Sequence, residues 1–311
     1  MKVAFVINPN AGKGNCARMW PQVEAAARLH FGQDIQVFRT SARGDGMRCA
    51  MQAVDSGAQL IVSVGGDGTH NEVINGLMQA REPRAFEFAI LSAGTGGDFR
   101  KTLELDADPH RALLQLREGR TVALDVGRIR YVDLDDHPAE RYFLNISSVG
   151  VGGLADKYAN ASSNLLGGKA TYLISSLRAT LQYKNQPVVI LADGREVYRG
   201  PLFVAAVCNG KFFGGGMRIA PDANPCDGSF SLVILQDFTW PDKIRMTQDV
   251  YAGAHVRHPR VSVHSCRVVE VQTDSREVGI DLDGEYPGRM PGVFTVVPGA
   301  LRMRVPRGAP L

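Results

Sequence analysis

GGDGT at residues 65–69 is the stretch whose residue types most directly indicate chemistry. Its three glycines permit backbone conformations that are closed to other residues, and they end an apolar run, LIVSVG (60–65). Thr69 is expected to cap a following helix, whose N-terminus favours a phosphate. A bare carboxylate beside a phosphate is repulsive, so Asp67 calls for a bridging cation, and Mg²⁺ is typically held by one or two carboxylates together with phosphate oxygens. The alternative is that Asp67 only forms a local turn.

Two further glycine-rich turns have residues that are compatible with a phosphate-binding site. NPNAGKGN (8–15) places Lys13 between Gly12 and Gly14, so that backbone N–H groups and a positive charge can approach a ligand. It is not a Walker A loop, because no GK pair is followed by Ser or Thr. In AGTGGDF (93–99), Thr95 is the expected contact to a phosphate or nucleotide. Asp98 is expected to pair with Lys13 or with a metal-bound water. Each turn alone also fits a plain helix start, but the three together favour an anion site.

DGE at 283–285 places two carboxylates around one glycine. In a strand, Asp283 and Glu285 would share a face, and two close acids push their pKa values apart. A hydroxyl that attacks phosphorus must lose its proton, and a nearby carboxylate is the expected base. The alternative is an exposed β-turn.

Alternating strand and helix patterns over the first 120 residues must position these turns. Strands are expected at 2–8, 35–40, 60–65 and 86–93, and helices at 15–31, 46–57, from Thr69 to about Met78, and at 109–119. This alternation predicts right-handed βαβ units and a parallel sheet. The three glycine-rich turns follow strands at the carboxyl edge, where such sheets bind ligands.

The pattern changes after about residue 122 to short strands with short links, among which helices are expected at about 167–182 and 240–252. The predicted fold class is therefore an α/β N-terminal domain with a parallel sheet, followed by a mostly antiparallel β-sandwich domain. We place the first domain, expected to bind nucleotide, at 1–124 and the β-rich domain, expected to bind lipid, at 125–297. The tail at about 298–311 is expected to pack back on the first domain.

Composition narrows the function classes. The chain has 311 residues, enough for two domains, and a net charge of +3, which argues against nucleic acid as the main partner. Its five cysteines form no CxxC pair and are read as reduced thiols in the cytoplasm. The segment with His255, His258 and His264 is expected to be irregular and without zinc. No apolar run approaches the roughly 18 residues of a spanning helix, so the expected membrane contact is peripheral.

The three turns, in this order, resemble the catalytic domain of the diacylglycerol kinase family, in particular the soluble bacterial lipid kinases. The quoted motifs are NPNAGKG, GGDGTHNEV and AGTGGDF, and the resemblance continues through CNGKFFGGGMRIAPDANPCDGSFSLVIL (208–235) and LDGEYPG (282–288). It therefore spans nearly the whole chain. GGDGT alone is shared with NAD kinases, whereas the combination is specific. One departure is Gly97, which stands where the family commonly has Asn, so the contacts of that Asn are lost or replaced.

The resemblance implies roles for particular residues. Those implied in ATP binding are Asn8, Pro9, Asn10, Ala11, Gly12, Lys13, Thr40, Gly65, Gly66, Asp67, Gly68, Thr69, His70, Asn71, Thr95 and Asp98. Asp67 is expected to hold the catalytic Mg²⁺. A second metal loop corresponds to Asn224, Asp227 and Ser229, where an ordinary Asp-Gly turn explains the same residues equally well. The DGE triplet is implied to be catalytic, with Glu285 as proton acceptor and Asp283 as the second candidate.

The resulting expectation is an ATP- and Mg²⁺-dependent kinase that phosphorylates a lipid hydroxyl. Diacylglycerol is the first choice, ahead of phosphatidylglycerol, sphingosine and ceramide. Two alternatives stay open, an NAD-kinase-like phosphotransferase acting on a soluble acceptor and a non-catalytic nucleotide- or lipid-binding regulator. The expected partner is lipid at a membrane surface, and a homodimer is compatible with the sequence. The stretch 164–185 either touches an anionic membrane surface or covers a sheet, and we favour the sheet.

Overall fold

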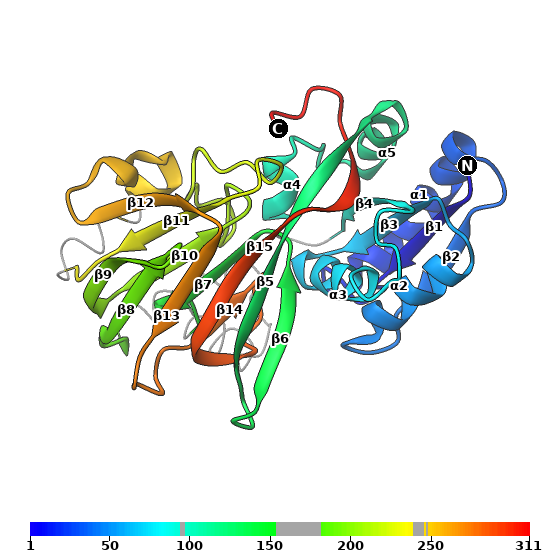
Figure 1. Cartoon of the computed structure of the whole chain (residues 1–311). Helices are drawn as coiled ribbons and strands as arrows, with labels where there is room; N and C mark the ends of the chain where they lie inside the picture. The colour runs from blue at the N-terminus through cyan, green and yellow to red at the C-terminus, as the bar shows by residue number, and fades with distance from the viewer. Residues whose placement is uncertain (94–96, 154–181, 239–245, 247) are drawn as a thin grey trace. The chain divides into compact units, whose positions relative to one another are not determined.

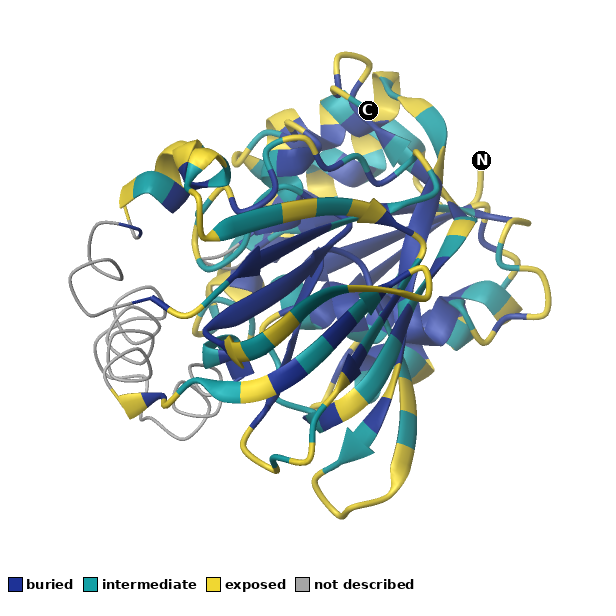
Figure 2. Ribbon diagram, turned by 60° about the vertical axis from the view of Figure 1, so that its left-hand side comes forward, coloured by how far each residue is buried: buried dark blue, intermediate teal, exposed yellow. Residues whose placement is uncertain are grey.

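Parallel strands with apolar sequences form the sheet in the N-terminal part of the chain. They are β1 (Val3–Ile7), β2 (Gln36–Arg39), β3 (Leu60–Gly65) and β4 (Glu87–Ser92), in the spatial order β2-β1-β3-β4. Every residue of β1 and β3 is buried, which is typical of parallel sheets that are covered on both faces (Figure 1; Figure 2). The four expected strands are confirmed.

The computed structural model describes residues 1–93, 97–153, 182–238, 246 and 248–311. The chain divides into two compact units, close to the boundaries expected from the sequence. Unit 1 comprises Met1–Val126 and Pro298–Leu311, and unit 2 comprises Gly127–Val297. We call Pro298–Leu311 the C-terminal tail.

Within the described residues, five helices accompany the sheet of unit 1. They are α1 (Asn15–Phe31), α2 (Asp45–Asp55), α3 (Asp67–Leu77), α4 (Asp98–Thr102) and α5 (Pro109–Glu118). Helix α1 packs against α5, and α2 packs against α3. Asp108 caps α5 by accepting hydrogen bonds from the amides of His110 and Arg111. The helices expected at 15–31, 46–57 and 109–119 are confirmed with small shifts at their ends, whereas α3 begins before Thr69.

The contact between α2 and α3 depends on two residues of α3. A Cβ at Gly76 would lie 2.5 Å from the carbonyl oxygen of Met47, so only glycine lets the helices approach this closely. Glu72 accepts hydrogen bonds from the amides of Gly44 (2.7 Å) and Gly46 (2.9 Å) at the N-terminus of α2. Glu72, the glutamate of GGDGTHNEV, therefore caps the neighbouring helix α2.

Antiparallel strands form unit 2. The strands that follow β4 along the chain are β5 (Arg120–Asp133), β6 (Pro138–Phe143), β7 (Ile146–Gly150), β8 (Gln186–Ala192), β9 (Arg195–Leu202), β10 (Val204–Cys208), β11 (Phe230–Leu235), β12 (Val261–Cys266), β13 (Val268–Gln272), β14 (Ile280–Leu282) and β15 (Gly288–Val305), with a 3-10 helix η2 (Ala254–Arg257). One sheet has the order β12-β11-β10-β7-β14. In the other, β13 pairs with β15 and β8, β8 with β9, and β5 with β6, all antiparallel.

The two sheets of unit 2 share one hydrophobic core. Phe143 at the end of β6 stacks on Phe230 of β11, with ring centroids 5.6 Å apart, and meets Phe294 of β15 edge-on at 6.3 Å. Because these rings come from both sheets, the sheets pack face to face. The predicted fold class, a parallel α/β domain followed by an antiparallel β-sandwich, is confirmed.

Unit 2 differs in part from what its sequence pattern predicts. RYFLNISSVG (141–150) contains the end of β6 and then β7, which are separate strands because the intervening amides bond to a distant carboxylate described below. The segment expected to be irregular contains β12, which pairs with β11. Strands β8 and β9 form an antiparallel hairpin across the turn at Asp193 and Gly194. The expected helix at 167–182 and the stretch 164–185 lie mostly outside the described residues, as does much of the helix at 240–252.

Arginines tie the C-terminal tail to the rest of unit 1. Arg304 Nη1 lies 3.0 Å from the Glu87 carboxylate of β4, and its Nε and Nη2 donate to the carbonyl oxygens of Leu116 and Arg117 at the end of α5. Arg302 also pairs with Glu87, at 3.3 Å, but its side chain is 47% exposed against 19% for Arg304. Arg304 therefore both caps α5 and joins the tail to β4.

The difference between these two arginines gives a stability prediction. Arg304→Ala should lower the free energy of unfolding by about 1–3 kcal/mol, because a part-buried carboxylate and helix-end carbonyls lose charged donors. Arg302→Ala should cost less than about 1 kcal/mol, since exposed ion pairs contribute little. Thermal unfolding midpoints of the two variants measure this directly. Equal shifts would contradict the capping role of Arg304.

Candidate active site

Two hydrogen bonds bring the three glycine-rich turns of unit 1 together. Asn8 follows β1, and its Nδ2 donates to Thr69 Oγ1 in α3 at 3.0 Å. The amide of Gly97, which precedes α4, donates to Asp67 Oδ2 at 3.1 Å. The turns after β1, β3 and β4 thus meet at the carboxyl edge of the parallel sheet, where such sheets bind ligands.

The loop after β1 is a closed turn. Gly12, Lys13 and Gly14 all have left-handed φ angles, of 60°, 60° and 78°. Asn8 Oδ1 accepts from the amide of Asn10, and the amides of Ala11 and Gly14 donate to carbonyl oxygens within the loop. We expected this loop to offer its N–H groups to a ligand, but these three amides are already bonded inside it. The left-handed glycines shape this turn, and a contact of the rest of the loop with a ligand stays a prediction.

The turn after β3 differs from the expectation in where its helix starts. Helix α3 begins at Asp67 with Gly66 as its N-cap and no side-chain cap, so Thr69 lies inside the first turn and does not cap it. A Cβ on Gly65 would lie 2.5 Å from Thr69 Oγ1, which explains the glycine at that position. Asp67 is half-buried at the positive end of the helix dipole, and this position favours its negative charge.

The next two residues of the motif point into the core. His70 is 1% exposed, and its Nδ1 lies 2.8 Å from Ser63 Oγ of β3. Asn71 is fully buried, and its side-chain oxygen accepts from Asn75 Nδ2 at 3.2 Å. The expected contacts of His70 and Asn71 with ATP therefore do not come from exposed side chains. Burial lowers the pKa of His70 from 6.5 to about 3, so this imidazole is neutral in the folded protein.

His70 should make stability depend on pH. Its folded pKa of about 3 lies below its unfolded pKa of 6.5, so the unfolded chain binds an extra proton between these values. Stability is then fully present above pH 6.5 and falls by up to about 1.4 kcal/mol for each pH unit below it. His70→Gln, which keeps a polar partner for Ser63, should flatten this slope in urea unfolding between pH 7.5 and 5. The same slope in both proteins would rule out His70 as its source.

The turn after β4 is described from Gly97 onward, so Thr95 lies outside the described residues. Gly97 has a left-handed φ of 82°, and a Cβ there would lie 3.0 Å from Ser92 Oγ. Asp98 is 5% exposed and forms an ion pair with Lys101 at 2.7 Å. Thr40 is also buried, and its amide donates to Ile7 O at 2.9 Å. Gly97 thus takes part through its backbone, by the bond to Asp67.

The DGE triplet of unit 2 lies in a tight turn. Asp283 and Gly284 have φ angles of 50° and 87°, and Leu282 and Glu285 exchange two backbone hydrogen bonds across them, of 2.8 and 3.0 Å. The condition under which the two acids would share a face, a continuous strand, is therefore not met. The turn directs the two carboxylates to different partners.

Asp283 and Asp281 both hold this turn in place. The Asp283 carboxylate is 8% exposed and accepts from the amides of Leu144 (2.8 Å), Asn145 (3.0 Å) and Ile146 (3.1 Å). Asp281 accepts from the Gly284 amide at 2.9 Å and from the Ser148 hydroxyl at 3.1 Å. These bonds give Asp283 an anchoring task, which favours Glu285 over Asp283 as the proton acceptor. Asp281 was not singled out from the sequence.

Glu285 makes an ion pair that the sequence did not indicate. Its Oε2 lies 3.1 Å from Arg141 Nη1 of β6, and the side chains of Glu285 and Arg141 are 15% and 26% exposed. The carboxylate is therefore neither in the core nor fully in solvent. Its role as proton acceptor stays a prediction.

The predicted second metal loop forms turns on itself. Asn224 Oδ1 accepts from the Cys226 amide at 3.1 Å, and Asp227 Oδ1 accepts from the amide and hydroxyl of Ser229, both at 2.9 Å. These bonds are those of ordinary Asx turns. A role for Asn224, Asp227 and Ser229 in metal binding stays a prediction.

Two family models match the chain. The diacylglycerol kinase catalytic domain matches residues 2–129, and the YegS C-terminal NAD kinase beta sandwich-like domain matches residues 145–305. The chain belongs to the family in which a diacylglycerol kinase catalytic domain is followed by a YegS C-terminal NAD kinase beta sandwich-like domain. It is therefore a kinase, that is, an enzyme of the phosphotransferase class.

Relatives in this family align over most of their length. A diacylglycerol kinase of Staphylococcus carnosus is 27% identical over 296 residues, which is 94% of this chain and 91% of the relative. A diacylglycerol kinase of Mycobacterium tuberculosis is 28% identical over 308 residues, covering 98% and 96%. The alignment thus includes both units and both candidate sets of site residues.

Solved structures support the fold alone. A diacylglycerol kinase from Bacillus anthracis superposes with a TM-score of 0.73 at 20% identity, covering 100% of this chain and 98% of that chain. A yeast NADH kinase in complex with NADH gives a TM-score of 0.51 at 9% identity, covering 100% and 84%. In the described part of the chain, no helix is long and apolar enough to cross a membrane.

The donor atoms of unit 1 fit a magnesium ion that arrives with a phosphate. Across the residues that the structure describes, no three His, Cys, Asp or Glu side chains are grouped to hold a metal by themselves. Asp67 offers a half-buried carboxylate at a helix N-terminus, and Mg²⁺ commonly combines one such carboxylate with phosphate oxygens. The chemistry of Asp67 therefore suits Mg²⁺, and Mg²⁺ binding stays a prediction.

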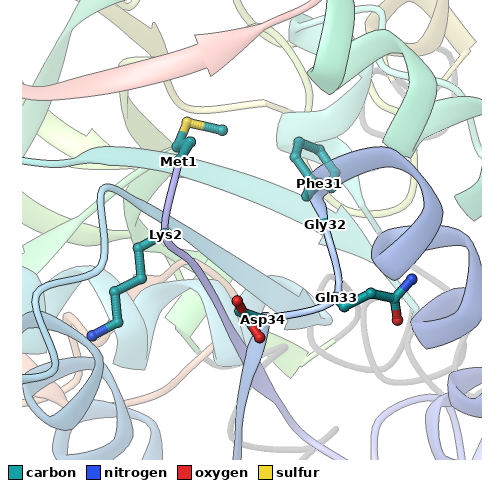
Figure 3. Close-up of a pocket in the computed structure, with 6 residues that line it drawn as sticks. All are labelled: Met1, Lys2, Phe31, Gly32, Gln33 and Asp34. Atoms are coloured by element: carbon teal, nitrogen blue, oxygen red, sulfur yellow. The ribbon is translucent and has the colours of Figure 1, made fainter.

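A surface hollow of unit 1 lies away from this edge. It has a volume of about 470 Å³ and is lined by Met1, Lys2, Phe31, Gly32, Gln33 and Asp34 (Figure 3). These residues precede β1 and connect α1 to β2, at the amino ends of the parallel strands. None of the predicted site residues lines it, so it does not belong to the candidate active site.

Proposed function

We propose that this kinase transfers the γ-phosphoryl group of ATP to the hydroxyl of a lipid, with diacylglycerol as the first choice, in a Mg²⁺-dependent reaction. The proposal that ATP binds to unit 1 rests on two hydrogen bonds, Asn8–Thr69 and Gly97–Asp67. Together they join three glycine-rich turns around the Asp67 carboxylate. The lipid part is supported by full-length relatives that are named diacylglycerol kinases. The acceptor is met at a membrane surface, and a homodimer is compatible with this function.

Residues of both units have separate tasks in this reaction. The hydroxyl oxygen of the lipid forms a bond to the γ-phosphorus, the bond from that phosphorus to the ADP oxygen breaks, and the hydroxyl proton passes to Glu285. Lys13 and the N-terminus of α3 stabilise phosphate charge. When bound, Mg²⁺ supplies further positive charge to the phosphates, with Asp67 as its protein ligand.

The two other functions fit these residues less well. An NAD-kinase-like enzyme would use the same GGDGT turn, and the likeness to NADH kinase is one of fold alone. A regulator without catalysis would not need Glu285 half-buried and paired at a rigid turn. Both alternatives are kept as outcomes of the assay below.

A label-transfer assay tests the proposal. The protein is incubated with γ-labelled ATP, Mg²⁺ and one acceptor at a time. The lipid acceptors are micelles of diacylglycerol, phosphatidylglycerol, sphingosine or ceramide, and NAD is the soluble acceptor. We expect label in the organic extract, highest with diacylglycerol, and none without Mg²⁺. Label in NAD alone would establish the soluble-acceptor alternative, and ATP binding without transfer to any acceptor would establish the regulator.

A further inference from the structure

Arg141 and Glu285 form an ion pair between segments far apart in the sequence. Arg141 lies on β6 opposite Ile129 of β5, and Glu285 follows the turn after β14 (green and orange-red in Figure 1). Arg141 Nη1 is 3.1 Å from Glu285 Oε2. The hairpin β5–β6 therefore supplies a positive charge directly to the carboxylate that the proposed reaction uses as its base.

The backbone of the turn is fixed independently of this pair. Asp283 holds the amides of Leu144, Asn145 and Ile146, and Asp281 holds the amide of Gly284. These bonds fix the backbone position of Glu285, but its side chain still has three rotatable bonds. Holding such a chain in one rotamer costs entropy, which a fixed ionic partner offsets. Arg141 provides that partner.

Tyr131 of β5 is electrostatically affected by both charges. Its side chain is buried, and burial is the largest cause that raises its pKa, while Arg141 lowers the pKa and Glu285 raises it. The tyrosine thus lies close to both partners. With side chains only 26% and 15% exposed, the Arg141–Glu285 pair is more enclosed than an ordinary surface ion pair.

We propose that Arg141 is a positioning residue for the proton-accepting carboxylate of Glu285. This inference rests on the proposed function. A base must lie within hydrogen-bond reach of the proton that it removes, so a fixed Glu285 meets the lipid hydroxyl in a productive geometry more often than a mobile one. The proton moves from the lipid hydroxyl to Glu285, and Arg141 keeps its own protons throughout. Proton release from Glu285 then restores the ion pair for the next turnover.

Variants at two arginines of the same hairpin test this role. Arg141→Met removes the charge, Arg141→Lys keeps a charge, and Arg128→Met is the matched control. Arg128 pairs with Glu140 across the same two strands, at 4.0 Å and 37% exposure, without touching the DGE turn. We expect Arg141→Met to lower kcat about tenfold with the KM for ATP unchanged, Arg141→Lys to restore part of the loss, and Arg128→Met to change kcat less than about twofold.

A double-mutant cycle separates positioning from a general loss of structure. In a Glu285→Gln background, Arg141→Met should cause no further loss of kcat beyond about twofold, because the base on which Arg141 acts is gone. The same tenfold loss in both backgrounds, or no loss in either, would overturn the inference. Unfolding midpoints exclude misfolding, and Arg141→Lys keeps the test valid if Arg141→Met is unstable. If the wild-type protein phosphorylates no lipid, both the proposed function and this inference are overturned. If the wild-type protein is active and Arg141→Met is equally active, only the inference is overturned.

Discussion

Glu285→Gln should lower kcat for lipid phosphorylation by about 10²–10⁴-fold, the usual contribution of general base catalysis. Gln has nearly the same shape and can still accept a hydrogen bond from Arg141, so the turn that carries it should persist. What it lacks is the ability to take a proton from the lipid hydroxyl. Initial rates of label transfer at saturating ATP and lipid measure the effect.

A matched control for Glu285 is Glu277→Gln. Glu277 is an exposed acid of unit 2 whose carboxylate accepts from Gln186 at 2.7 Å, and it has no place in the proposed reaction. Its variant should keep the wild-type rate within about twofold. If Glu285→Gln were as active as Glu277→Gln, Glu285 would not be the base, and Asp283 would have to be reconsidered in spite of its three amide bonds.

Asp67→Ala should lower the rate by at least about tenfold, equivalent to about 1.4 kcal/mol of barrier. The carboxylate is the expected protein ligand of Mg²⁺, and its loss should also raise the Mg²⁺ concentration needed for half-maximal activity. Asp67 also accepts the Gly97 amide and lies at the positive end of α3, so some loss of stability is expected, on the order of 1 kcal/mol.

Asp67→Asn separates the two tasks of Asp67. Asn can still accept from the Gly97 amide but brings no negative charge to a cation. We therefore expect Asp67→Asn to unfold close to the wild-type midpoint while its Mg²⁺ requirement shifts as in Asp67→Ala. An unchanged rate and Mg²⁺ requirement in both variants would leave Asp67 as a residue of the turn only.

Local sequence patterns were sufficient to predict most of the strands and helices of unit 1. Short apolar runs gave the bounds of β1 and β3 to within a residue or two, because burial on both faces leaves Ser63 as the one polar residue in these two strands. The start of α3 was wrong because Thr69 is a good capping residue by type. The helix instead begins at Asp67, where a glycine N-cap allows Thr69 to turn back onto Gly65 and bond Asn8.

Long-range contacts account for what sequence reasoning missed in unit 2. Asp-Gly is a strong turn signal, so the tight turn at 283–284 could have been predicted, but not that Asp283 would bind amides 137–139 residues earlier in the chain. The same contacts separate β6 from β7. Arg141 and Asp281 carry no local motif, and only the fold brings them to Glu285 and its turn.

The central claim is that this chain phosphorylates a lipid hydroxyl, and the mass of the product tests it most directly. Wild-type protein, ATP and Mg²⁺ are incubated with an equimolar mixture of diacylglycerol in micelles and NAD, and both acceptors are recovered and weighed by mass spectrometry. The account predicts diacylglycerol heavier by one phosphoryl group and NAD unchanged. Phosphorylated NAD beside unmodified lipid would contradict it.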